Sequence, residues 1–231
     1  MRLIGVIGGM SWESTAVYYR LFNEAARERA GGLHSARLLV WSFDFAEIEA
    51  LQAAGDWDGA TARLADAARA LKAAGAEVLV IATNTMHKMA DAVQAAAGLP
   101  LVHIADATAG AARAAGMRRP LVLATRYTME QDFYLGRLRD RHGLDPVVPD
   151  AASRETVHRI IYEELCRGVI RAESHAAYLD VIARMRANEG IDGLVYGCTE
   201  VGLLLDPADT DLPAVDSTRV HVTAALDAAT G

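Results

Sequence analysis

One strand-and-turn pattern occurs twice in this chain, about half a chain apart. Residues 75–85 and 190–200 each contain a glycine, an acid two residues later, a four-residue apolar stretch, a small residue and three polar residues. Two further matches follow the same order, 4–11 with 121–128 and 99–102 with 212–215, and the three offsets are 117, 115 and 113 residues. Matches in the same order at nearly constant offset indicate a duplicated unit.

The repeat makes the polar triplets Thr83-Asn84-Thr85 and Cys198-Thr199-Glu200 equivalent. A pseudo-twofold arrangement would aim Thr83 and Cys198 at one another, which is the geometry needed to approach one carbon from both faces.

Short apolar strands alternate with amphipathic helical segments along the whole chain, which predicts parallel sheets covered by helices. The predicted fold is therefore α/β, with two pseudo-symmetric, doubly wound parallel-sheet domains. Several strands are apolar on both faces, as in a covered parallel sheet. Strands are expected at 2–7, 36–42, 77–82, 100–104, 119–124, 145–148, 192–196 and 213–215.

Length and composition narrow the class of protein. The 231 residues suit two units of roughly 100–150 residues each, and 52% hydrophobic residues can fill two cores. A net charge of −7 argues against a nucleic-acid surface. No apolar run reaches the ~20 residues that span a bilayer, and no signal-peptide pattern is present. Two cysteines in different contexts are expected to be free thiols, so a cytoplasmic protein is predicted.

Polar residues follow four of the expected strands, at 8–11, 83–85, 125–128 and 198–200. Ligands of such sheets bind beyond the carboxyl ends of the strands. Each segment resembles a strand-to-helix turn whose N–H groups and hydroxyls can hold an anion at a helix N-terminus. A small carboxylate fits this set of donors better than a large cofactor.

Cys198 is the main candidate for a catalytic residue. A free cysteine is often a core residue, but helix dipoles at a strand end would lower the pKa of this thiol towards neutrality. Cys166 is interpreted as a packing residue. Thr83 is either a helix N-cap or the counterpart of Cys198, with a hydroxyl too weakly acidic to be an efficient base without activation. Asn84 and Thr85 are either substrate ligands or turn formers.

Other site classes find little support. The glycines at 5, 8 and 9 have the wrong spacing for a dinucleotide fingerprint. The seven histidines show no metal-ligand spacing. His87, one helical turn after Thr83, either tunes that turn electrostatically or is structural. Lys88 is interpreted as a solvated residue, so a Schiff base with pyridoxal phosphate is not expected. The histidine spacing likewise gives no reason to expect a metal.

Five segments resemble the aspartate/glutamate racemase family, which also includes hydantoin racemases, maleate isomerases and arylmalonate decarboxylases. The racemase branch fits best, and the matching segments are 5–13 (GVIGGMSWE), 42–45 (SFDF), 83–87 (TNTMH), 125–132 (TRYTMEQD) and 197–200 (GCTE).

The resemblance implies cofactor-independent chemistry by two opposed thiols in the cleft between the domains. Cys198 matches the second thiol and Thr83 stands where the first is usual, as in the L-aspartate/glutamate-specific subgroup. Arg126 and Arg167 are candidates for binding the side-chain carboxylate. The positions that match the family's substrate-binding residues are Met10, Gln52 (by local alignment only), Asn84, Thr85, Thr125, Tyr127, Thr128 and Thr199.

The resemblance also implies a homodimer and a crossed connection, in which the strand at Leu99 enters the second domain and the strand at Leu212 returns to the first. The expected domains are 1–98 with 207–231, and 99–206. The predicted function is racemisation of L-aspartate or L-glutamate without pyridoxal phosphate. The alternatives are a maleate isomerase or decarboxylase of the same superfamily, and a non-catalytic protein that binds small carboxylates.

Overall fold

The computed structural model describes all 231 residues, which form two compact units. The first unit contains Met1–His103 and His221–Gly231, and the second contains Ile104–Val220. The chain therefore leaves the first unit once and returns to it once. None of its helices is both long and apolar enough to cross a membrane.

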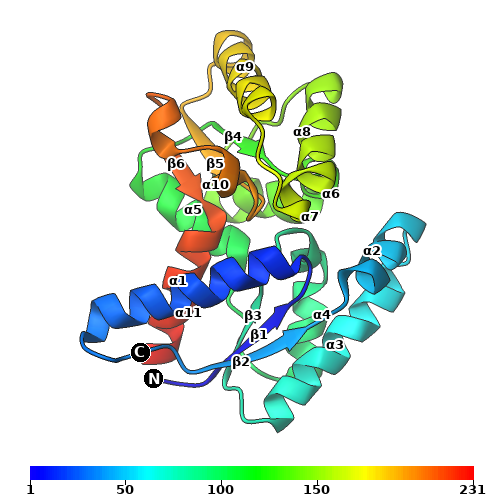
Figure 1. Cartoon of the computed structure of the whole chain (residues 1–231), viewed down its shortest axis with the longest axis vertical. Coiled ribbons are helices and arrows are strands. Elements are labelled where there is room, and N and C mark those ends of the chain that lie inside the picture. Colours follow the sequence, from blue (N-terminus) through cyan, green and yellow to red (C-terminus); the bar gives the residue numbers. More distant parts are fainter. The chain divides into compact units, whose positions relative to one another are not determined.

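The first unit is built on a parallel sheet in the order β2-β1-β3, with β1 (Ile4–Gly8) between β2 (Leu38–Ser42) and β3 (Val78–Ile81) (Figure 1). A single parallel bridge between Leu79 and Leu101 extends the sheet beyond β3. The central strand is buried along its whole length, as its continuous apolar sequence predicts.

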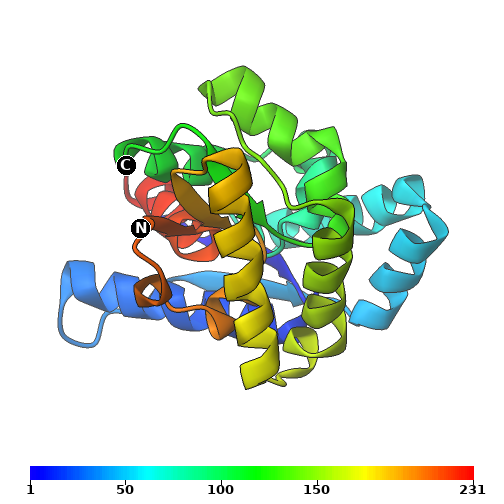
Figure 2. The same ribbon diagram turned by 90° about the horizontal axis from the view of Figure 1, so that it is seen from above.

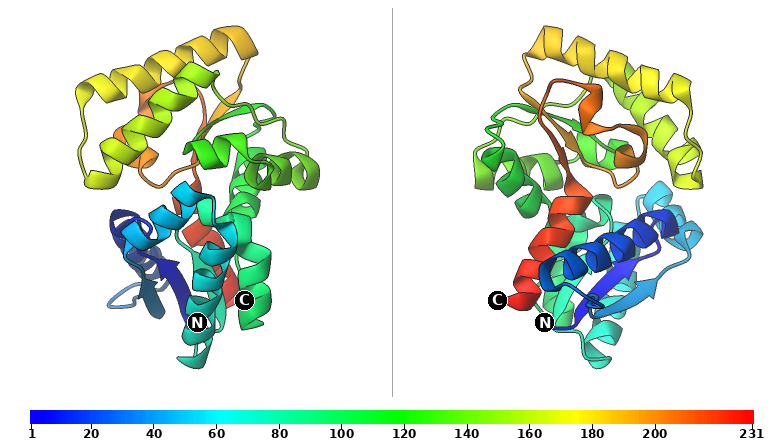
Figure 3. Two further views of the ribbon diagram at one scale, coloured as in Figure 1. Left: turned by 90° about the vertical axis from the view of Figure 1, so that its right-hand side faces the viewer. Right: turned by 60° about the vertical axis from the view of Figure 1, so that its left-hand side comes forward.

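Successive side chains of a strand point to opposite faces of the sheet. The apolar side chains of β1 therefore need cover on both faces, and helices provide it. Ile4 and Val6 pack with α1 (Trp12–Ala30) and with the part of α11 (Ser217–Thr230) that belongs to the first unit. Ile7 packs with the other group of helices, α2 (Phe45–Ala54), α3 (Trp57–Ala73) and α4 (Ala90–Ala97). The chain ends lie close together in this unit (Figure 3), where Arg2 N–H donates to Ala229 O at 2.8 Å.

The second unit has its own parallel sheet in the order β4-β5-β6, with β5 (Gly193–Tyr196) between β4 (Pro120–Leu123) and β6 (Ala214–Asp216). A bridge between Leu121 and Val147 extends it beyond β4. Its longest helices, α8 (Ala151–Glu163) and α9 (Ala172–Glu189), lie side by side (Figure 2), and Tyr178 Oη donates to Val157 O at 3.3 Å. The remaining helical segments are α5 (Ile104–Ala114), α6 (Arg126–Glu130), α7 (Asp132–Gly136), η2 (Arg137–Arg141), η3 (Leu165–Arg167), α10 (Val201–Leu204) and η4 (Pro207–Asp209).

The strand pairing confirms the predicted duplication. With the bridging residues included, the first sheet runs β2, β1, β3, Leu101, and the second runs Val147, β4, β5, β6. Segments that match in sequence therefore occupy the same place in each sheet. The expected strands at 100–104 and 145–148 are reduced to single bridges, and α5 already begins at Ile104.

The predicted crossing of the two strands is wrong. Leu79 N–H donates to Pro100 O at 2.9 Å and Val102 N–H to Leu79 O at 3.0 Å, so the segment at 99–102 stays in the first sheet. Leu194 N–H likewise donates to Pro213 O at 2.8 Å, which keeps β6 in the second. Each edge segment satisfies its backbone groups on the nearest strand of its own repeat. The chain crosses only after these strands, beyond residues 103 and 220 rather than 98 and 206.

Candidate functional site

The predicted site residues divide between the two units. Apart from Gln52, which lies on α2, they follow the carboxyl ends of the strands. In the first unit Ala82 N–H donates to Ile7 O at 2.8 Å, so the turns after β1 and β3 are neighbours. In the second, Gly197 N–H donates to Leu123 O at 2.9 Å, so the turns after β4 and β5 are neighbours. The first unit holds Met10, Gln52, Thr83, Asn84 and Thr85, and the second holds Thr125, Tyr127, Thr128, Cys198 and Thr199.

The turn after β1 is fixed by close backbone packing. Gly9 has a φ of 80°, and a side chain there would collide with the backbone N and O of Phe43. Gly9 N–H donates to Thr15 Oγ1 at 2.7 Å, and the Ser11 side chain caps α1 by accepting from Ser14 N at 3.2 Å. The positive φ and the close approach of Phe43 explain why a glycine directly precedes the buried Met10.

The turn after β3 carries buried polar side chains. Thr83 is half-buried, whereas Asn84 and Thr85 are buried. The helix that follows is the short 3-10 segment η1 (Thr85–Met89), and the residue that precedes it is Asn84. No side-chain capping bond closes the start of η1, so the N-cap interpretation of Thr83 finds no support.

Gln52 lies on the buried face of α2, one turn after Ile48. Its side chain is 4% exposed, and its amide oxygen has no hydrogen-bond partner. Burying an acceptor without a donor is costly. The Oε1 atom therefore fits a ligand that brings an N–H donor, such as an ammonium group.

In the second unit the turn after β4 places two threonine hydroxyls together. Thr125 Oγ1 and Thr128 Oγ1 are 3.4 Å apart, and both side chains are buried. Tyr127 is half-buried, with its ring 6.0 Å from that of His158 in an edge-on arrangement.

Cys198 donates a hydrogen bond to a buried carboxylate. Its Sγ lies 2.9 Å from Glu200 Oε2, and the second oxygen of Glu200 accepts from Cys166 Sγ at 3.6 Å. Glu200 is only 3% exposed, and Thr199 between them is also buried. Both cysteines are free and half-buried. One carboxylate therefore serves both thiols of the protein.

The expected lowering of the Cys198 pKa is wrong. Burial raises the pKa of this thiol well above its usual range, and the negative charge of Glu200 raises it further. The helix expected to supply a favourable dipole is α10, which has only four residues. Cys198 is thus held in its protonated form, with Glu200 positioned to accept the proton.

The helices after the other strand-end turns differ in length. The turn after β1 leads into the 19-residue α1. The turn after β3 leads into η1, which α4 continues without a break. The turn after β4 leads only into the five-residue α6, so hydroxyls and individual N–H groups are the available donors there.

Glu200 is a candidate site residue that the sequence did not single out. Its signal was its place in the second polar triplet, two residues after Cys198, but the fold of the turn was needed to bring its carboxylate back to the thiol. Cys166 packs against the core of the second unit, as predicted, and also contacts Glu200.

The two basic candidates are exposed. Arg126 forms an ion pair with Glu155 at 3.6 Å and lies 5.9 Å from the ring centre of Tyr127. Arg167 ends the short segment η3. No group of three or more His, Cys, Asp or Glu side chains is arranged to hold a metal ion.

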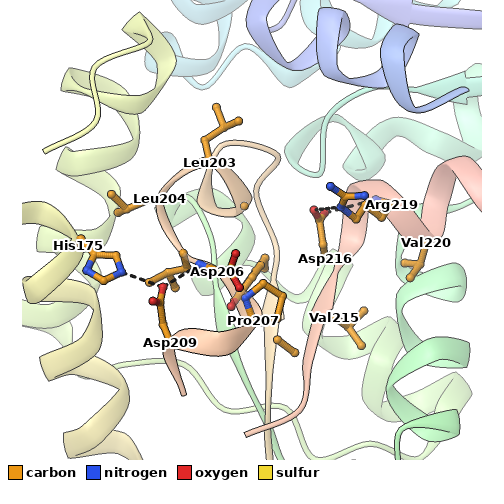
Figure 4. A pocket seen from close by; sticks show the side chains of 14 residues that line it. His175, Leu203, Leu204, Asp206, Pro207, Asp209, Val215, Asp216, Arg219 and Val220 are labelled. Carbon is orange, nitrogen blue, oxygen red and sulfur yellow. Dashed lines mark hydrogen bonds and ion pairs between the residues drawn. The ribbon is translucent and has the colours of Figure 1, made fainter. Parts of the chain in front are cut away.

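A pocket of about 520 Å³ in the second unit contains none of the predicted site residues (Figure 4). It lies beside β6 and α10, where His175 Nε2 is 2.8 Å from Asp209 Oδ2 and Arg219 Nε is 3.6 Å from Asp216 Oδ2. Asp206 accepts from Ala208 N at 2.8 Å. All three carboxylates that line the pocket therefore already have partners within the second unit.

The Asp/Glu/hydantoin racemase family model matches residues 7–225. A candidate Asp/Glu racemase from Yersinia pestis is 52% identical over the whole of both chains, with a TM-score of 0.92. The chain belongs to the Asp/Glu/hydantoin racemase family. An aspartate racemase homologue from Pyrococcus horikoshii is 36% identical over the whole of both chains, with a TM-score of 0.87.

A more distant structure shows how widely this racemase family shares the fold. The aspartate racemase of Picrophilus torridus is 20% identical, covers 99% of this chain and 94% of its own, and has a TM-score of 0.79. The predicted family and fold class are thereby confirmed.

Proposed function

We propose that this racemase-family protein moves the Cα proton of L-aspartate or L-glutamate without a cofactor, with Cys198 as its principal acid and base. The observation that carries the proposal is the Cys198 thiol bonded to the buried Glu200 carboxylate at the carboxyl edge of the sheet. A thiol with a proton acceptor at 2.9 Å can give up its proton to act as a base and can take a proton back to act as an acid.

The proton balance of the proposed step is simple. The Cys198 S–H bond breaks and its proton moves to Glu200 Oε2, which leaves a thiolate. The thiolate takes the Cα proton, and the electron pair of the C–H bond moves into the adjacent carboxylate as an enolate. Threonine hydroxyls and turn N–H groups would stabilise this developing charge. Return of a proton to Cα from Cys198 regenerates the L-enantiomer, and return of the Glu200 proton to the thiolate restores the starting protein. Exchange of the Cys198 proton with solvent while the enolate persists brings deuterium to Cα.

Thr83 is proposed to serve the other face of the same carbon. A threonine hydroxyl is a far weaker acid than a thiol, so protonation from that side would be slow. The expected behaviour is rapid proton exchange of the L-amino acid with slower racemisation. Enantiomers have equal free energy in water, so a true racemase has equal kcat/KM in both directions, and only kcat and KM separately differ.

Substrate contacts are proposed for Met10, Asn84, Thr85, Thr125, Tyr127, Thr128 and Thr199. Gln52 is assigned more narrowly, to the α-ammonium group, because its buried Oε1 is an acceptor that lacks a donor. Arg126 is a weak candidate for binding the side-chain carboxylate of the substrate, since it already pairs with Glu155.

The deciding experiment is proton NMR of L-aspartate and L-glutamate, separately, in deuterated buffer, with optical activity followed in parallel. Loss of the Cα–H signal with matching loss of optical activity establishes racemisation. Loss of that signal alone establishes exchange with retention. Absence of exchange with both acids contradicts the proposal and redirects the search to maleate isomerisation, decarboxylation or simple carboxylate binding.

Replacing Thr83 by cysteine should raise turnover of the D-enantiomer by at least about tenfold, because a thiol is the better acid and base. Chiral chromatography of D-aspartate and D-glutamate reactions measures the effect. Thr83→Ser, which keeps a hydroxyl, is the matched control and should show no such gain. An unchanged D-side rate in the cysteine variant would remove Thr83 from the second face.

We further propose a homodimer that acts in the cytoplasm. Strand β2 forms an edge of the first sheet, and Val40 and Trp41 on it are both at least 40% exposed. An exposed apolar edge strand is normally covered. Light scattering of the purified protein should give twice the 24.7 kDa chain mass, and Trp41→Glu should shift it to the monomer. A monomeric wild type would contradict this assembly.

A further inference from the structure

A cluster of three histidines lies in the interior of the first unit, behind the turn that carries Thr83. His87, His103 and His221 are all buried. The ring of His87 is 4.7 Å from that of His103 and 5.3 Å from that of His221. They come from η1, from the last residue before α5 and from α11, so three separate segments meet at this point.

Hydrogen bonds determine which ring nitrogen of His221 carries the proton. A carbonyl oxygen only accepts, so the 2.8 Å contact between His221 Nε2 and Val102 O requires the proton on Nε2. Nδ1 of His221 is then the acceptor for Tyr18 Oη at 2.8 Å. His221 is thereby anchored on both sides, to α1 and to the last extended segment of the unit.

His87 connects this anchored cluster to the Thr83 turn. Its Nδ1 lies 2.8 Å from the carbonyl oxygen of Thr83, so Nδ1 is the donor and the Thr83 carbonyl the acceptor. The ring of His87 is held by its packing on His103 and His221. Through His87, the Thr83 main chain is therefore linked to side chains that are distant in sequence.

We infer that His87 is a positioning residue for Thr83, holding the turn so that the threonine hydroxyl meets one face of the substrate carbon. This inference rests on the proposed function. Cys198 lies in the other unit and bonds to Glu200, so proton exchange at its face does not require the contact between His87 and Thr83. Loss of that contact should slow racemisation selectively, since small misplacements of a reacting group cost large factors in rate.

The test compares His87→Asn with His87→Leu. The asparagine amide nitrogen takes nearly the place of Nδ1 and still donates, whereas leucine has the same shape without a donor. The ratio of racemisation to exchange should stay near the wild-type value in the asparagine variant and fall at least about tenfold in the leucine variant. Equal ratios in the two variants would overturn the inference.

A second readout does not depend on activity. Three-bond NMR couplings across χ1 of Thr83 should report one rotamer in the wild type and in His87→Asn, and rotamer averaging in His87→Leu. One unchanged rotamer in the leucine variant overturns the inference even if no amino acid is turned over. Absence of exchange in the wild type, by contrast, contradicts the proposed function alone.

If the leucine variant does not fold, His87→Gln replaces it. The longer side chain carries its amide nitrogen to the Nε2 position, so it stays polar but cannot reach the Thr83 carbonyl in the same way. It should behave as the leucine variant is expected to behave, and a ratio equal to that of His87→Asn would count against the inference.

Discussion

Replacing Cys198 by alanine should lower Cα-proton exchange of the L-amino acid by at least about a hundredfold, the lower end of what a general acid–base group contributes. The loss follows because Cys198 is the proposed acid and base, whereas Cys166 contacts the other oxygen of Glu200, at 3.6 Å, and has no proposed role at Cα. Deuterium entry at Cα measures it. Cys166→Ala is the matched cysteine control and should retain exchange of the same order as the wild type. Substantial exchange in the Cys198 variant would contradict the assignment.

The role of Glu200 can be separated from that of the thiol. In a Cys166→Ala background Cys198 is the only cysteine left, so thiolate absorbance titrates it alone. Glu200→Gln removes the negative charge that raises the Cys198 pKa, so the titration should move to lower pH while exchange slows for want of a proton acceptor. Glu200→Asp keeps the charge and should titrate more like the parent. An unmoved titration in the glutamine variant would show that the Glu200 charge does not contribute to the raised Cys198 pKa.

The second large effect is acid destabilisation of the first unit through its buried histidines. Burial lowers the pKa of His221 to about 4 from an ordinary value of 6.5. The folded state then binds fewer protons than the unfolded state, so the stability is present above pH 6.5 and is lost as the pH falls towards 4. At about 1.4 kcal/mol for each pKa unit, His221 alone accounts for about 3 kcal/mol at pH 4.

His87 acts in the same direction. Its pKa is lowered well below the usual value by burial and then by the neighbouring His103 and His221, and no carboxylate is among the groups that shift it. Protonation of His87 or His221 is therefore not favoured by any carboxylate among the groups that shift their pKa values.

Urea unfolding at pH 7, 5.5 and 4 measures this effect. All three tryptophans, Trp12, Trp41 and Trp57, lie in the first unit, so tryptophan fluorescence follows that unit alone. His221→Gln keeps a donor near Nε2 but does not titrate. Subtracting the unfolding free energy of this variant from that of the wild type removes the contribution of surface carboxylates, which both proteins share. The unfolding free energy of the wild type, minus that of His221→Gln, should fall by about 3 kcal/mol between pH 7 and pH 4. A constant difference would show that His221 is not the group responsible.

Much of the fold could be read from local patterns. Strand β3 and strand β5 are short apolar runs between a glycine and a polar triplet, and burial on both faces leaves such a sequence few alternatives to a covered parallel strand. The offsets between repeats then predicted which strands correspond, and the two sheets have them in corresponding places.

Strand partners were less accessible to sequence. The segments at 99–102 and 212–216 look alike in either unit, and only the backbone hydrogen bonds at Pro100 and Pro213 decide to which sheet each belongs. An apolar edge segment is compatible with several neighbours, because its pattern records that it is buried but not against which strand.

The sequence by itself determined the duplicated α/β architecture, the strand ends at which the polar residues gather, and the Thr83 and Cys198 equivalence, since all of these follow from local periodicity and spacing. The tertiary structure alone decided that Glu200 turns back onto Cys198 and raises its pKa, and that His87, His103 and His221 meet behind Thr83. The reason is physical. A pKa depends on burial and on the charges within a few ångströms. The local turn decides whether Glu200 points back at Cys198, and the three histidines become neighbours only when the chain has folded.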